Sequence, residues 1–474
     1  MKILFTNSPL HFSHGHTFTQ PDWQTLILPY LAGIVGPEYE IKLVDNMHSF
    51  LKSNRILNEV KKFQPDLIGF SIIASRDIFN TLDVIKQVRS NFPKTKIIAG
   101  GQASSYYYEW LLNSGVDIVV HGEGEKTLEE LVQVISNDSS DYAKIEGISY
   151  LLDNSIKLNN PRKLMKTLDE APIPRFDLMP LLKSKWFTDM NTGSVEMSRG
   201  CSYDCNFCAI SSFWKSFRRK SNDKILQELE ILYKQNRRHI YLADDNFGMG
   251  EEKHIDLFKK IIKEKWNMKF FAQIRTDTIA NHPEMIEWAA KTGFYGMLVG
   301  FDTYNKDTFN NITKTTSLEL NVNASKILRK NNIAIFGTHI YGLPDQKTPL
   351  DFYETFKMGR KYSDLFRMPH FSPLPFTKGY EDVVPLNPKS SDVTSVDQES
   401  KKDFRPRVGD EKHKKIMKLG YDIYTWIHNL SPSEISGALF HSNPAVRRFK
   451  QQGYIATSRH YLYKFLRDYN ITDI

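Results

Sequence analysis

The sequence predicts an α/β protein built from two β/α domains and a helical C-terminal segment, on three observations. The chain has 474 residues, more than the roughly 100–200 residues of one ordinary domain. Short apolar runs alternate with amphipathic stretches in two separate series, and this alternation indicates parallel sheets covered by helices. Hydrophobic residues make up 41%, charged residues 25% and aromatic residues 12% of the chain, a globular balance that excludes collagen-like and wholly disordered proteins.

The first series spans residues 1–135 and includes the apolar runs KILFTN, DLIGFSII, KIIAGG and VDIVVHG. Amphipathic helical patterns separate these runs, so the strands are expected to be parallel, with helices on both faces of the sheet. This domain is predicted to be an open, doubly wound, Rossmann-like fold. Such sheets bind ligands at the carboxyl ends of their strands.

Residues 136–193 have weaker periodicity and are interpreted as a connector. They contain a candidate hairpin at GISYLLDNSIKLN and a turn-rich stretch around Pro172 and Pro174. The connector is expected to lie over the next domain.

The second series spans residues 194–386 and contains six apolar runs, beginning at SVEMSRG. Six β/α units predict a partial relative of the eight-fold barrel, with its chemistry at the carboxyl ends of the strands. One helix has clear start and stop signals. Asn281 and Glu284 have capping-box spacing, Pro283 falls in the first turn, and Gly293 follows the last turn.

Residues 387–474 complete the chain and are predicted to form a linker and a helical domain. The stretch from 387 to 413 is polar, as linkers are, and the remainder is helical in pattern and rich in aromatic residues. We expect this segment to cover the barrel mouth and shape a substrate pocket, with plain core packing as the alternative.

The charge and the hydropathy of the chain limit which partners and which cellular compartment are expected. The net charge of +8 and the pI near 9.0 invite a nucleic-acid interpretation. Lysine and arginine are nevertheless interspersed with aspartate and glutamate, so the basic excess is weak support for it. No apolar run approaches the ~18 residues of a membrane span, and the N-terminus turns polar too early for a signal peptide. The sequence therefore predicts a cytoplasmic protein with no membrane span.

All three cysteines of the chain, Cys201, Cys205 and Cys208, lie in one window with CxxxCxxC spacing, directly after a predicted strand. A disulfide framework is excluded, and a shared ligand role is the leading interpretation. Structural zinc requires four closed ligands. An iron–sulfur cube takes four cysteines, so a set of three leaves one iron open. The alternative is a zinc site or a group of buried thiols.

The stretch RGCSYDCNFC resembles the cluster loop of radical S-adenosylmethionine (SAM) enzymes, in which the open iron of a [4Fe-4S] cluster binds the amino and carboxylate groups of SAM. The resemblance covers more than the loop. The segments FWKSFRRKS, YLADDNF, GFDT, GLP and SPLPFT are similar to successive strand ends of those radical SAM enzymes that carry an N-terminal cobalamin-binding domain.

By this resemblance, six residues beside the cysteines are implied to contact SAM. The residues implied to hold its amino acid portion are Asp244 and Asp245. Those implied to point to its ribose or carboxylate, at strand ends, are Gln273, Arg275 and Asp302. The residue implied to lie near its adenine, between two cysteines, is Phe207. Strand-end solvation or helix capping is the alternative role for the charged members.

The same resemblance implies that cobalamin lies across the carboxyl edge of the first sheet. The implied contacts are small residues that let its nucleotide tail approach the backbone, followed by a loop that closes over that side. They are Ser71, Gly100 and Gly101, and then Gly122, Glu123, Gly124 and Glu125. The chain lacks the DxHxxG motif that supplies a cobalt ligand in many cobalamin proteins. The loop histidines His11, His14 and His16 are not expected to replace it, so the lower axial ligand stays open.

The resemblance implies reductive cleavage of SAM to a 5′-deoxyadenosyl radical and C-methylation of an unactivated carbon through methylcobalamin. A small molecule or natural product is the expected substrate, and a low-potential flavodoxin or ferredoxin is the expected electron donor. Cyclisation or ring rearrangement without methyl transfer is the alternative. An RNA-modifying methylthiotransferase or an RNA-binding protein is more distant, because the further cysteine triad and the basic C-terminal barrel of the methylthiotransferases do not occur here.

Overall fold

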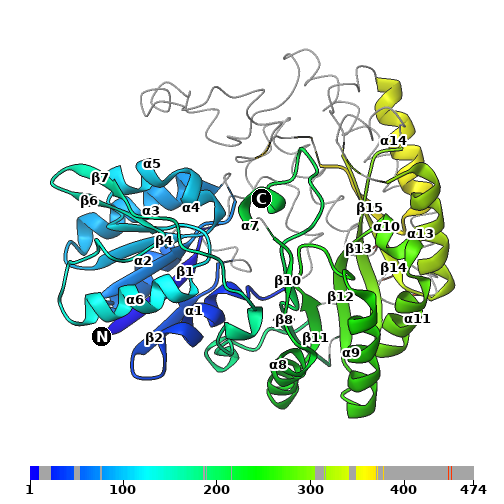
Figure 1. Ribbon diagram of the computed structural model, residues 1–474, viewed down its shortest axis with the longest axis horizontal. Helices are drawn as coiled ribbons and strands as arrows, with labels where there is room; N and C mark the ends of the chain where they lie inside the picture. The colour runs from blue at the N-terminus through cyan, green and yellow to red at the C-terminus, as the bar shows by residue number, and fades with distance from the viewer. Residues whose placement is uncertain are drawn as a thin grey trace, which may run out of the picture.

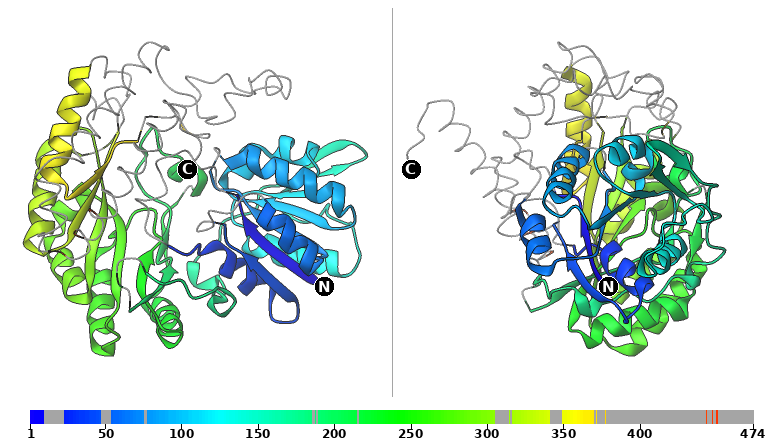
Figure 2. Two further views of the ribbon diagram at one scale, coloured as in Figure 1. Left: turned by 180° about the vertical axis from the view of Figure 1, so that it is seen from behind. Right: turned by 90° about the vertical axis from the view of Figure 1, so that its left-hand side faces the viewer.

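A computed structural model shows two α/β domains side by side, as seen in Figure 1 and from behind in Figure 2. The structure describes residues 1–9, 23–46, 54–74, 77–184, 187, 189–214, 216–304, 314, 316–340, 349–369, 371, 377, 443, 447 and 450. The predicted linker and helical domain at 387–474 thus lie almost wholly outside the described residues.

The N-terminal domain is built on a seven-stranded sheet with strand order β2-β1-β3-β4-β5-β6-β7. The first five strands are parallel, and β6 and β7 add an antiparallel hairpin at one edge. The hairpin expected at 147–159 therefore forms and extends this sheet. The strands are β1 (Lys2–Asn7), β2 (Glu40–Val44), β3 (Leu67–Ser71), β4 (Lys96–Gly100), β5 (Ile118–Val120), β6 (Ile148–Leu152) and β7 (Ser155–Leu158).

Helices cover both faces of this sheet, which confirms the doubly wound prediction. In β1, Ile3 and Phe5 pack with α1 and α6 on one face, and Leu4 between them packs with α2 and α3 on the other. The alternation follows from the two-residue period of a strand. The helices are α1 (Ile27–Val35), α2 (Asn54–Phe63), α3 (Ile78–Asn91), α4 (Gln102–Tyr106), α5 (Tyr108–Asn113) and α6 (Glu125–Ser136).

The second domain is a six-stranded, all-parallel sheet with strand order β15-β14-β13-β12-β11-β8. This confirms the partial barrel of six β/α units. In chain order, the strands are β8 (Asn191–Val195), β11 (Arg237–Leu242), β12 (Lys269–Arg275), β13 (Phe294–Asp302), β14 (Ala334–His339) and β15 (Leu365–Arg367).

Helices line the outer, convex side of the barrel sheet in Figure 1. They are α8 (Asn222–Lys234), α9 (Glu251–Glu264), α10 (Thr276–Asn281), α11 (Pro283–Thr292), α13 (Leu318–Lys330) and α14 (Pro349–Tyr362). A short antiparallel pair, β9 (Ser198–Arg199) with β10 (Arg218–Arg219), and the short helix α7 (Ile210–Trp214) lie on the side that faces the N-terminal domain.

One local prediction was wrong. Asn281 ends α10 instead of capping the next helix, and His282 is the N-cap of α11, with no side-chain capping hydrogen bond. Pro283 stands at the helix start and Gly293 ends it with a φ of +116°, both as predicted. The two helices are separated by one residue, which a spacing pattern alone does not reveal.

Aromatic side chains fill part of the inner side of the barrel sheet. Phe271, Tyr295 and Phe336 are buried there. Trp23, which precedes α1 in the N-terminal domain, stacks on Tyr241 with ring centroids 4.9 Å apart. The segment before α1 is therefore part of the barrel packing.

The buried guanidinium of Arg237 ties the connector to the barrel. It donates to the carbonyl oxygens of Phe176, Met179 and Thr192, at 3.2, 2.6 and 3.2 Å. It also donates to the side-chain oxygen of Gln24. Burial lowers its pKa to about 10. The later part of the connector thus contacts the barrel, whereas its hairpin belongs to the first sheet. Within the described residues, no helix is both long enough and apolar enough to cross a bilayer.

Candidate functional site

The three cysteines lie on one loop that follows β9 at the side of the barrel nearest the N-terminal domain. All three are free thiols, and Cys205 is buried. The amide of Cys208 donates to the carbonyl oxygen of Cys205 at 3.1 Å, which folds the loop back on itself. Burial raises the pKa of the Cys208 thiol to about 11 and also raises that of Cys205. A bound metal cation favours the deprotonated ligand and offsets this effect.

Two polar groups point at the sulfur atoms. The amide of Asn246 donates to Sγ of Cys201 at 3.7 Å, and the guanidinium of Arg275 donates to Sγ of Cys205 at 3.6 Å. Donors aimed at sulfur suit thiolates that ligate an iron–sulfur cluster, whose potential such bonds tune. Among the described residues, no group of three or more histidine, cysteine, aspartate or glutamate side chains is placed to hold a single metal ion. In an iron–sulfur cluster each thiolate binds a different iron, so the three thiolates need not converge on one ion.

The end of β11 holds the start of the cluster loop. Asp244 is fully buried, and its carboxylate accepts from the backbone amides of Met197 and Ser198, at 2.7 and 3.0 Å, and from the Ser198 hydroxyl at 2.8 Å. Asp245 accepts from the amide of Gly200 at 2.8 Å. Burial raises their pKa values to about 7 and about 6. Both aspartates support the loop, which is a contact that their expected SAM-binding role did not include.

The other predicted SAM-binding residues gather at neighbouring strand ends. Arg275, at the end of β12, forms a bidentate pair with Asp277 and stacks on Tyr203 of the cluster loop, 3.6 Å from the ring centroid. Gln273 donates to the carbonyl oxygen of Asp244 at 2.8 Å.

Asp302, at the end of β13, pairs with Lys314, has a φ of +57° and is buried. Phe207 packs against Ile340, the residue that follows β14. The expected residues therefore come together on one edge, although they are spread over a hundred positions of the chain.

The predicted cobalamin residues occupy the matching edge of the first sheet. Ser71 ends β3, and its carbonyl oxygen accepts from the amide of Ser8 at 3.2 Å. This contact lies between β1 and β3, where the strand order reverses and open sheets bind ligands. Gly100 ends β4. Gly101 follows with a φ of +100°, and a Cβ added there would lie only 2.6 Å from the carbonyl oxygen of Ile72.

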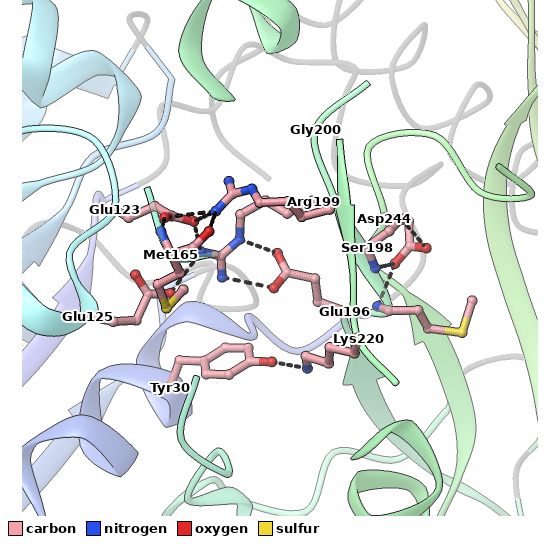
Figure 3. A network of polar contacts seen from close by, with 12 residues as sticks. Tyr30, Glu123, Glu125, Met165, Glu196, Ser198, Arg199, Gly200, Lys220 and Asp244 are labelled. Atoms are coloured by element: carbon pink, nitrogen blue, oxygen red, sulfur yellow. Dashed lines mark hydrogen bonds and ion pairs between the residues drawn. The ribbon is translucent and has the colours of Figure 1, made fainter. Parts of the chain in front are cut away.

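The loop after β5 meets the barrel. Gly122 has a φ of +71° and open space around it, and Gly124 is the N-cap of α6. Glu123 lies between them, and its carboxylate is bound by Arg199 and Arg218 of the barrel domain, each at 2.8 Å. Glu125 also pairs with Arg199, at 2.9 Å. Figure 3 shows these two glutamates facing Arg199.

Two matches to known families decide the identity. Residues 19–132 match the B12 binding domain, and residues 195–358 match the radical SAM superfamily. The chain is a radical SAM enzyme with a B12-binding domain. The two matches together cover more than half of the chain; the first contains strands β2 to β5 and the second contains strands β11 to β14. The expected cofactors are those of these domains: cobalamin, SAM and a [4Fe-4S] cluster.

Named relatives of this radical SAM enzyme differ in activity. A protein named as an uncharacterized methyltransferase from Pyrococcus horikoshii is 28% identical over 367 residues, which cover 76% of this chain and 78% of the relative. The anaerobic magnesium-protoporphyrin IX monomethyl ester cyclase of Rubrivivax gelatinosus is 25% identical, over 81% of this chain and 70% of the cyclase. The cobalamin-dependent radical SAM enzyme OxsB, solved with aqua-cobalamin and SAM, has a TM-score of 0.69 at 18% identity, covering 100% of this chain and 73% of OxsB. This last likeness supports the fold.

Sequence reasoning missed several residues of the enzyme's site. The side-chain amide of Asn246 donates to Sγ of Cys201, and Tyr203 of the cluster loop stacks against Arg275. For Arg199 and Arg218 the sequence holds no local signal, because their carboxylate partner Glu123 is 76 and 95 residues away.

Proposed function

We propose that the enzyme transfers a methyl group from SAM to an unactivated carbon of a small molecule. The observation that carries this proposal is the contact of the B12-binding edge with both ends of the cluster loop. At one end, Glu123 binds Arg199, which stands two positions before Cys201. At the other end, Gln102 of the B12-binding domain donates to the carbonyl oxygen of Ala209 at 3.4 Å. A cofactor on that edge lies beside the cluster loop.

When bound, a [4Fe-4S] cluster would supply an electron, received from the low-potential donor, for reductive cleavage of SAM, and cobalamin would supply a carrier for the methyl group. The chain binds and orients them. Cys201, Cys205 and Cys208 are proposed to ligate the cluster. Asp245, Arg275 and Asp302 stand at the ends of three adjacent strands and are proposed to bind the polar groups of SAM.

The relative named as a methyltransferase supports methyl transfer and is similar over most of its length. The cyclase relatives support a second candidate, oxidative cyclisation without methyl transfer, because one of them matches 81% of this chain. For either activity the substrate is proposed to be a small molecule and the electron donor a low-potential flavodoxin or ferredoxin.

An isotope experiment separates the two candidates without knowledge of the substrate. The reconstituted enzyme is given hydroxocobalamin, a low-potential reductant and SAM with a trideuterated methyl group under anaerobic conditions. Methyl transfer predicts S-adenosylhomocysteine and label in the corrinoid fraction, because the sulfonium loses its methyl group to the reduced corrinoid. Cyclisation without methyl transfer predicts 5′-deoxyadenosine, with no S-adenosylhomocysteine and no label in the corrinoid fraction.

Two controls assign the products. The variant Cys201→Ala is expected to lose 5′-deoxyadenosine formation and to keep S-adenosylhomocysteine formation, since only the former requires the cluster. Omission of hydroxocobalamin is expected to abolish S-adenosylhomocysteine formation and to leave 5′-deoxyadenosine formation. Methyl transfer is rejected when reductant and hydroxocobalamin are both present and the corrinoid fraction stays unlabelled.

A further inference from the structure

A buried group of five charged side chains lies between the two domains. Glu123 comes from the loop after β5 of the B12-binding domain and Glu125 from the first position of α6. The other three, Glu196, Arg199 and Arg218, come from the barrel domain around β9 and β10. The side chains of Arg199 and Glu123 are only 6% and 5% exposed. Charged groups are rarely buried to this extent unless each one is paired.

The guanidinium of Arg199 is the centre of the group. Its Nη1 donates to Glu123 at 2.8 Å and pairs with Glu125 at 2.9 Å. Its Nε and Nη2 bind the two oxygens of Glu196 at 3.1 and 2.9 Å. One side chain thus joins a carboxylate of its own domain to two carboxylates of the other domain, as Figure 3 shows.

Glu123 is held from three directions. Nη1 of Arg218 donates to both of its oxygens, at 2.8 and 2.9 Å, and the backbone amide of Met165 in the connector donates to Oε2 at 2.8 Å. With Arg199 included, both carboxylate oxygens are engaged by protein groups. The contacts of Glu123 therefore assign it to the domain interface.

A polar interface of this kind fixes one orientation of the two domains. Apolar surfaces tolerate small sliding movements, whereas hydrogen-bonded ion pairs lose several bonds together when they shift. A second buried contact adds to this restraint. Lys220 of the barrel domain binds Tyr30 of α1 and pairs with Glu228 at 2.6 Å, with the Lys220 and Glu228 side chains fully buried. Inter-domain movement, which is otherwise the default for separate domains, is thereby limited.

The backbone transmits this restraint to the cluster loop. Arg199 is followed by Gly200 and then by Cys201. Gly200 has a φ of +87°, its amide donates to Asp245 at 2.8 Å, and a Cβ there would lie 2.0 Å from the carbonyl oxygen of Ser216. The peptide between Arg199 and the first cysteine thus has little room to move. A displacement of Arg199 displaces Cys201.

We propose that Glu123, Arg199 and Arg218 form an interdomain latch that positions the cobalamin-binding edge against the cluster loop. In this role they are positioning residues, and they couple occupancy of the B12-binding domain to the order of the loop at 200–208. The proposal applies to methyl transfer and to cyclisation alike, so rejection of either activity leaves it standing.

The test measures amide hydrogen exchange in the cluster loop of the full-length, reconstituted enzyme, with and without hydroxocobalamin. The variant Glu123→Gln keeps the shape of the side chain and removes its charge. The matched control is Glu130→Gln, whose carboxylate pairs with Arg162 in the connector and makes no contact with the latch. Hydroxocobalamin affinity is measured on the same samples by absorbance titration.

In the parent enzyme and in Glu130→Gln, hydroxocobalamin is expected to slow exchange in the loop. In Glu123→Gln, exchange is expected to be about tenfold faster, equivalent to about 1.4 kcal/mol, and to respond little to hydroxocobalamin, while affinity changes by less than about threefold. Parent-like exchange in Glu123→Gln overturns the proposal. So does a more than tenfold loss of affinity with parent-like exchange, because Glu123 is then a ligand contact.

The variant Arg218→Gln keeps the proposal testable where Glu123→Gln does not fold. It leaves the bond between Arg199 and Glu123 in place, so an intermediate rise in loop exchange is expected. Parent-like exchange in this variant overturns a role for Arg218 and, with it, the latch as defined.

Discussion

Replacement of Gly200 by alanine tests whether the cluster loop depends on one backbone conformation. Gly200 has a φ of +87°, and an added Cβ would meet the carbonyl oxygen of Ser216 at 2.0 Å. Gly250, the N-cap of α9, is a matched control. Its φ is +79°, and nothing lies within 4 Å of an added Cβ. The two variants share the backbone strain and differ in the collision.

The magnitude follows from these two contributions. A non-glycine residue in the left-handed region costs about 1–2 kcal/mol, which applies to both variants. The collision at Gly200 adds about 1–3 kcal/mol, the usual cost of overpacking. Because each kcal/mol lowers the melting temperature by about 2–4 °C in a domain of this size, Gly200→Ala should melt about 2–12 °C below Gly250→Ala.

Calorimetry of the apoprotein measures this difference, and iron and sulfide analysis after anaerobic reconstitution measures its effect on the cluster. Gly200→Ala is expected to hold less than half of the iron of Gly250→Ala, since relief of the collision moves Cys201. Equal melting temperatures together with equal iron contents would refute the argument that the loop needs this conformation.

Three other variants test other parts of the structure. Gly101→Ala places a Cβ 2.6 Å from the carbonyl oxygen of Ile72, so hydroxocobalamin affinity should fall about tenfold for about 1.4 kcal/mol of strain; an unchanged titration contradicts this. Arg237→Met removes the guanidinium donor from the carbonyl oxygen of Met179 and one of the two donors to that of Phe176, and a buried acceptor left without a partner costs about 1–3 kcal/mol, so limited proteolysis should cut the connector faster than in the parent. Burial raises the pKa of Asp244 from 3.8 to about 7, so the folded state binds this proton more tightly and stability falls as pH rises from about 4 to about 7. Asp244→Asn should reduce this fall, as urea midpoints across that range will show; a parallel pH dependence in parent and variant counts against it.

The cysteine spacing and the alternation of strands with helices could be predicted from the sequence because they are local properties. Cys201, Cys205 and Cys208 lie within one turn-rich loop, and parallel strands bring their carboxyl ends to one edge whatever the details of packing. The matches to the B12 binding domain and the radical SAM superfamily confirm that interpretation. The assignments of individual SAM and cobalamin contacts stay predictions.

The role of a charged residue at a strand end could not be predicted from the sequence. Asp244 has the same local signal as a ligand-binding aspartate, yet its carboxylate is occupied by the backbone of Met197 and Ser198, 46 to 47 positions away. Local pattern shows that a carboxylate reaches the edge of the sheet. Which donor it meets there depends on how the neighbouring loop folds over it.

The amino-acid order by itself determined the two alternating β/α series and the three-cysteine loop, because side-chain periodicity and ligand spacing are set over a few residues. Only the tertiary structure decided that Glu123 faces Arg199 across the domain boundary and that Trp23 packs inside the barrel. The physical reason is that a buried charge or ring takes its partner from whatever the packed chain brings within a few ångströms, and sequence distance carries no information about that choice.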